Sequence, residues 1–90
     1  MANWKKMYRN LEKGDIIRTK VSNPHNPKYG EYVYAVATGE GFGSRTDTIG
    51  NAIFVIHQSY DLEKVLENRN VETKDWDRWE RFWGIDIMEG

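Results

Sequence analysis

The densest group of residues able to bind a ligand is a glycine-rich run over residues 39–48. Three alternating glycines allow backbone amides to turn toward one centre, and the residues after them supply hydroxyl donors and a guanidinium whose planar fork fits phosphate oxygens. The run lacks the Gly-Lys-Ser/Thr of a Walker A loop and the following helix of a dinucleotide fingerprint. It is either an anion site or a hairpin connection that is rich in glycine because it turns. For an anion site, the expected phosphate-binding residues are Gly41, Gly43, Ser44, Arg45 and Thr46.

Aromatic residues flank this run. Phe42 stands between two glycines, where few neighbours cover it, and Tyr32 and Tyr34 share one face of the preceding predicted strand. Each tyrosine alone is explained by ordinary cross-strand packing. Together with Arg45 they form an aromatic and cationic set, of the kind on which small β-domains stack nucleotides or single-stranded nucleic acid. We therefore add Phe42, Tyr32 and Tyr34 to the expected ligand-binding residues.

Catalytic and metal-binding patterns are missing from the sequence. The chain has no cysteine, its serines do not lie in a nucleophile-elbow pattern, and its two histidines, His25 and His57, are far apart with no partner at ligand spacing. The acidic residues are those of ordinary solvated faces, with no pair that stands out. We expect a protein that is not an enzyme and that uses neither a metal nor another cofactor.

The net charge of -1 conceals an uneven distribution. Residues 1–45 carry eight bases and four acids, whereas residues 46–90 carry five bases and ten acids. Either the basic half binds a polyanion, or the two halves attract each other in the fold. The overall charge argues against a general binder of duplex DNA. The acidic half also suggests a protein-interaction or inhibitor module, with Asp75, Asp77 and Glu80 on the partner-binding surface.

The periodicity of the apolar residues indicates a mixed fold. Residues 3–12 and 74–83 have apolar residues at helical spacing, the second as a tryptophan stripe, and either Ser59 or Asp61 is placed to cap a short helix over 60–68. Residues 15–21, 30–38, 52–56 and 85–88 are typical of strands. The stripe fits core packing or a self-association surface, so a homo-oligomer is one of the expected states. We predict an α+β domain: a small curled antiparallel sheet or partial barrel, made of a three-strand meander and a C-terminal strand, with an N-terminal helix and two short helices packed on it.

The length and composition set the remaining expectations. Ninety residues without a linker or repeat predict one domain over 1–90, and twelve aromatics exclude a disordered chain. No apolar run suits a membrane span or a signal peptide, and the chain carries no disulfide, so we expect a cytoplasmic protein that does not bind membranes. Small viral and mobile-element proteins share this general character. The predicted function is capture of a nucleotide or a short single-stranded nucleic acid, and the alternative is the protein-interaction or inhibitor module.

Overall fold

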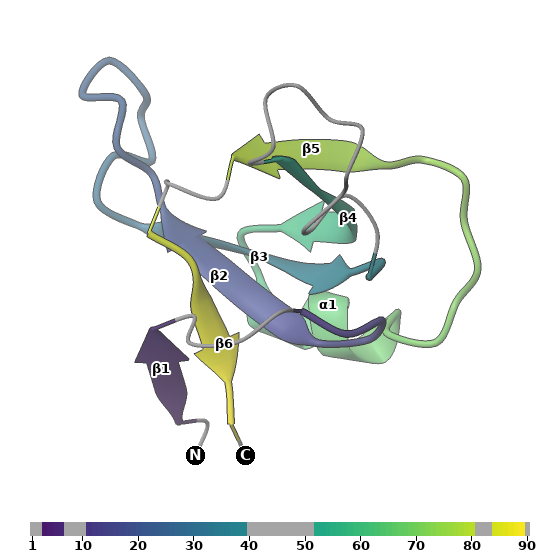
Figure 1. The fold of residues 1–90 in the computed structure, drawn as a ribbon. Helices are drawn as coiled ribbons and strands as arrows, with labels where there is room; N and C mark the ends of the chain where they lie inside the picture. The colour runs from purple at the N-terminus through teal and green to yellow at the C-terminus, as the bar shows by residue number, and fades with distance from the viewer. Residues whose placement is uncertain (1–2, 7–10, 40–51, 81–83, 90) are drawn as a thin grey trace.

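Among the residues that the structure describes, the architecture is a six-stranded antiparallel sheet with one short helix (Figure 1). The computed structural model describes residues 3–6, 11–39, 52–80 and 84–89. The strands lie in the order β1-β6-β2-β3-β4-β5, so the last strand of the chain inserts between the first two. Their bounds are β1 Trp4–Lys6, β2 Ile16–Lys20, β3 Tyr32–Ala37, β4 Ala52–Ser59, β5 Asp77–Glu80 and β6 Asp86–Met88, and helix α1 spans Leu62–Glu67.

The main core lies on one face of this sheet. Side chains alternate between the two faces of a strand, and residues from β2 to β6 that point to this face form the core. Its buried members are Leu11, Ile17, Ala35, Ala37, Ile53, Val55, Trp79, Ile85 and Ile87. No helix among the described residues packs on this cluster, because the residues of α1 belong to the cluster on the other face. The sheet therefore has to curl around its own core to exclude water from it.

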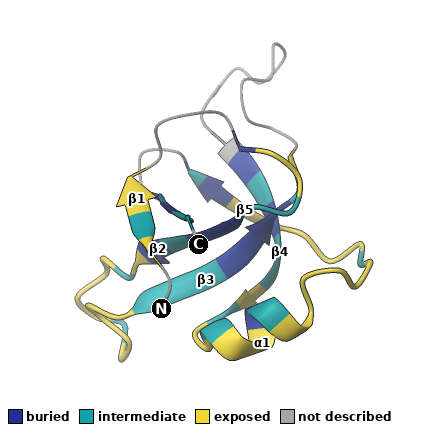
Figure 2. Cartoon of the chain, turned by 90° about the horizontal axis from the view of Figure 1, so that it is seen from below, coloured by how far each residue is buried: buried dark blue, intermediate teal, exposed yellow. Residues whose placement is uncertain are grey.

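The opposite, outer face is covered in part by α1. Val65 of the helix is fully buried against Ile16 and Val36, while the side of α1 away from the sheet is exposed (Figure 2). The side chain of Asp61 accepts a hydrogen bond from the Glu63 amide at 3.0 Å, which identifies Asp61 as the N-cap. A helix of six residues is unstable alone. Packing against β3 and β4 is therefore what holds α1 in place.

The predicted α+β class is wrong. The N-terminal helix expected over 3–12 is absent where the structure describes that range, because Trp4–Lys6 forms β1 and pairs with β6. Residues 7–10 lie outside the described part. A three-turn helix is marginal by itself. A strand at this position instead forms backbone hydrogen bonds with an edge of β6 that would otherwise be unpaired. Within the described ranges, no helix is long and apolar enough to cross a membrane.

The prediction of a helix over 74–83 is also wrong. Its central part, Asp77–Glu80, is β5 and pairs with β4 from Ala52 to Val55. Trp79 points into the main core and is 2% exposed, whereas Trp76 precedes the strand and is 52% exposed. A helical stripe would have buried both. The apolar β4 needs a partner on its far side, and that non-local pairing overrides the local helical spacing.

A bulge in β4 changes which residues face the core. Tyr34 pairs with Ser59 and Val36 pairs with Ile56, so β4 contains one residue more than β3 over this stretch. His57 lies in the bulge with φ 57°, in the left-handed region that a non-glycine residue rarely adopts. Its imidazole Nε2 lies 2.8 Å from the carbonyl oxygen of Val71. The bulge thus ties the segment after α1 to the sheet.

Candidate nucleic-acid interface

The strands β1, β2 and β3 place three aromatic rings and three cations on the outer face of the sheet, beside the part that α1 covers. The register sets Lys20 opposite Tyr32 and Arg18 opposite Tyr34, and pairing through β6 brings β1 alongside. Alternate residues of each strand share this face. We call this set the aromatic–cationic face; its members are Trp4, Lys6, Arg18, Lys20, Tyr32 and Tyr34.

The rings of the face form a connected cluster. The Trp4 and Tyr34 centroids are 5.7 Å apart, and those of Tyr32 and Tyr34 are 6.4 Å apart, both in tilted geometry. These separations lie in the range that favours aromatic pairs. All three residues are half-buried, so the cluster is anchored to the sheet and still presents ring surface to solvent.

Arg18 organises this cluster. Its Cζ lies 4.4 Å from the Trp4 ring centroid and 3.8 Å from the Tyr32 ring centroid, so the guanidinium stacks on both. Its Nε donates to Oδ2 of Asp86 at 2.9 Å, and both side chains are less than one-fifth exposed. Cation–π contacts and a partly buried ion pair fix the positions of the rings before any ligand arrives.

The charge of the face is positive. Lys6 and Lys20 are exposed, and the Lys20 Nζ lies 5.5 Å from the Tyr32 centroid. Asp86 is the acidic residue whose pairing places it among these cations, opposite Lys6 and Arg18. Three cations against one carboxylate leave a net positive surface around the rings. Such a surface can attract phosphate groups while the rings stack on bases.

The structure brings Tyr32 and Tyr34 together, but it separates them from the start of the glycine-rich run. Val36 lies between Tyr34 and Thr38 on the same face of the strand, and it is buried under α1. Tyr32 and Thr38 are about 20 Å apart along the strand at about 3.3 Å per residue. The remaining expected ligand-binding residues, Gly41, Phe42, Gly43, Ser44, Arg45 and Thr46, lie outside the described residues.

Sequence reasoning missed Trp4 and Arg18 as members of this face. Trp4 fits a helical pattern with later residues, and Arg18 is one polar residue in an alternating strand. Arg18 meets Tyr32 because β2 pairs with β3, and Trp4 reaches Tyr34 and Arg18 because β1 joins the sheet through β6. A local signal exists for Arg18: it and Lys20 are cations on the same face of one predicted strand, and Tyr32 and Tyr34 share a face of the next. That signal predicts cross-strand cation–aromatic pairs if the two strands are neighbours.

The expected partner-binding acids are not gathered on one surface. Asp75 and Asp77 are exposed, but Glu80 is half-buried and pairs with Arg78. Asp77 and Glu80 are three residues apart in β5, so they lie on opposite faces of the strand. The protein-interaction hypothesis stays a prediction.

The chemistry available to the aromatic–cationic face is binding. The face supplies stacking surfaces and cations, and its carboxylate is held by Arg18. Among the residues that the structure describes, no three histidine or acidic side chains come together as metal ligands. The chain matches no protein-family model, no curated protein and no solved structure.

Proposed function

We propose that the protein is a binding module that captures a phosphate-bearing ligand, a nucleotide or a short single-stranded nucleic acid, on the aromatic–cationic face. The observation that supports this is the clustering of Trp4, Tyr32 and Tyr34 around Arg18, with two exposed lysines beside them. Base stacking is tolerant of sequence, and cations beside the rings attract the backbone. The cytoplasm is the proposed compartment, because a chain with no cysteine needs no oxidising environment.

Three features of the face suit a single strand. The rings project from an open sheet surface, where successive bases can stack without being enclosed. The ring centroids of Tyr32 and Tyr34 are 6.4 Å apart on one strand, so neighbouring bases can each contact one ring. Asp86 engages Nε of Arg18. Within the described contacts, this leaves the Nη groups of Arg18 for a phosphate oxygen.

The test is a titration of labelled single-stranded oligonucleotides and of mononucleotides, followed by fluorescence anisotropy and by quenching of the tryptophans. Loss of one stacking ring in Tyr32→Ala is expected to weaken binding by about 1–3 kcal/mol. Lys20→Ala should weaken binding and lower the slope of log affinity against log salt by about 0.7, the value for one phosphate contact with a single strand.

Two matched variants serve as controls. Tyr29 is 59% exposed and Lys64 is exposed on α1, and neither belongs to the aromatic–cationic face. Tyr29→Ala and Lys64→Ala should leave affinity unchanged. If Tyr32→Ala and Lys20→Ala bind every oligonucleotide and nucleotide as the parent does, the proposal is wrong.

The glycine-rich run is tested separately by Arg45→Ala. A fall in affinity and in salt dependence in this variant would show that the run contributes to phosphate binding, as the sequence predicts. Unchanged values would limit the site to the aromatic–cationic face.

A further inference from the structure

A second surface, distinct from the aromatic–cationic face, is a groove between the turn before β2 and the segment that follows α1. Two hollows of about 260 and 290 Å³ make up this groove, and they share Lys13, Ile56 and Glu72. One end of the groove is lined by Gly14, Arg69 and Asn70, and the other by Thr38, Thr73 and Trp76. The shared residues make it one continuous feature.

The floor of the groove is apolar and rigid. Val36 of β3 is buried beneath it at 1% exposure, the side chain of Ala37 belongs to the main core on the other face, and the half-buried Ile56 of β4 supplies apolar surface that a ligand can reach. Trp76 closes one end with a ring that is 52% exposed and packs on Phe54 at a centroid distance of 5.6 Å. A half-exposed tryptophan at the end of an apolar floor offers a contact for an aromatic or aliphatic body.

Both walls of the groove are held in place. On one side, the Gly14 amide donates to the Ala37 carbonyl at 2.9 Å, and the Ala37 amide donates to the Asp15 carbonyl at 2.8 Å. Gly39 packs so closely there that a Cβ on it would lie 3.0 Å from the Lys13 nitrogen. On the other side, the strained His57 binds the carbonyl of Val71. Backbone strain of this kind persists where the surrounding structure fixes it, and it is frequent at ligand sites.

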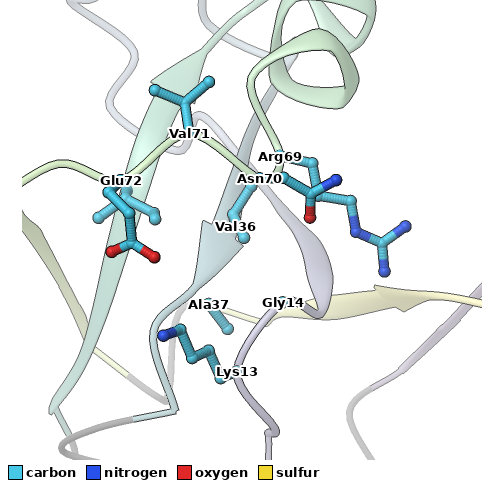
Figure 3. Close-up of a pocket in the computed structure, with 9 residues that line it drawn as sticks. Lys13, Gly14, Val36, Ala37, Arg69, Asn70, Val71 and Glu72 are labelled. Atoms are coloured by element: carbon cyan, nitrogen blue, oxygen red, sulfur yellow. The ribbon is translucent and has the colours of Figure 1, made fainter.

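The charges of the groove are unequal. Figure 3 shows the ends of Lys13 and Glu72 on one side of the hollow and the Arg69 guanidinium on the other, beside Asn70. Two cations against one carboxylate leave one positive charge in excess. Arg69 is exposed, and it presents the planar fork that matches a carboxylate. A monoanion is therefore complementary to the groove. The second negative charge of a dianion would be repelled by the Glu72 carboxylate.

We infer that this groove binds a small organic acid with a single carboxylate at Arg69 and an apolar, ring-bearing body that extends over Ile56 to Trp76. The inference is independent of nucleic-acid binding, because none of these residues belongs to the aromatic–cationic face. Each part of the ligand has its own contact. The carboxylate accepts hydrogen bonds from the Arg69 guanidinium and the side-chain amide of Asn70, and the ring packs on Trp76.

The test compares three probes with the full chain: phenylbutyrate, its neutral amide, and butyrate, which lacks the ring. Binding is followed by heteronuclear NMR through the backbone amides of Gly14, Asn70 and Val71 and the indole N–H of Trp76. Phenylbutyrate should shift these signals and bind about tenfold more tightly than the amide, the order expected for one charge-assisted hydrogen bond. Butyrate should also bind more weakly than phenylbutyrate.

Variants then assign the two ends. Arg69→Gln should reduce phenylbutyrate affinity to that of the amide, and Trp76→Ala should reduce it to that of butyrate. Glu72→Gln should tighten binding, because it removes a repulsive charge. Lys64→Gln and Tyr60→Ala, at exposed residues outside the groove, should change nothing. Equal binding of acid and amide, shifts confined to other surfaces, or no binding of any probe would overturn the inference.

Discussion

The two tryptophans around β5 offer the sharpest test of the fold. Trp79 is 2% exposed in the main core, and its Nε1 donates to Oε1 of Gln58, whereas Trp76 is 52% exposed. A buried tryptophan removes up to about 250 Å² from water, and its truncation to alanine costs about 3–5 kcal/mol. Gln58, which accepts from the Trp79 indole, is exposed, so water can replace this donor in Trp79→Ala and the expected cost comes from the lost burial.

Trp76→Ala should cost much less. About half of the Trp76 side chain already contacts water, and its removal opens no enclosed cavity, so the loss is its contact with Phe54 and part of its area, about 1–2 kcal/mol. A domain of this length has a total stability of about 5–13 kcal/mol. Trp79→Ala therefore removes a large fraction of that total, and Trp76→Ala a small one.

The assay is urea denaturation followed by circular dichroism, which does not depend on the fluorophore that the variants remove. If Trp79→Ala does not fold, Trp79→Phe retains a ring and should lose about 1–3 kcal/mol through the smaller volume. Equal losses for the two positions would refute the reasoning.

Two further pairs of variants test local features. Gly39 and Gly30 have φ of 83° and 86°, but a Cβ would meet the Lys13 backbone only at Gly39. Gly30→Ala should cost about 1 kcal/mol from strain alone, and Gly39→Ala about 2–3 kcal/mol by chemical denaturation; equal costs would contradict the close packing at Lys13. Asp61→Ala should lose about 1 kcal/mol as the N-cap of α1, while Asp61→Asn stays near the parent. An equal loss in both Asp61 variants would rule out capping as the cause.

The strands of the middle of the chain could be predicted because their signals are local. Residues 52–56 are uniformly apolar, and the stretch around Tyr32 and Tyr34 alternates, so both imply extended chain whatever surrounds them. The short helix after Asp61 is local too. The strands at Trp4 and Trp79 could not be predicted in this way, because apolar residues spaced by three or four around each of them also suit a helix.

The candidate site was predictable to the same extent. Tyr32 and Tyr34 share a face because side chains alternate along one strand, so the sequence indicated two of the six members of the aromatic–cationic face. The position of Trp4 depends on where β1 and β6 pair in the sheet, and that of Arg18 depends on the pairing of β2 with β3. Such non-local pairing leaves no trace in a window of ten residues.

The position of β6 between β1 and β2 has a consequence for folding. The ion pair between Arg18 and Asp86 joins residues separated by 68 positions. The sheet cannot acquire its final strand order before the chain has been synthesised through Met88. Loop-closure entropy must be overcome before these pairings contribute, which places the protein among the slower-folding small domains, in the range of about milliseconds to seconds. Until then Trp4 and Ile17 lack their β6 neighbours, so the nascent chain exposes apolar surface that the folded protein does not.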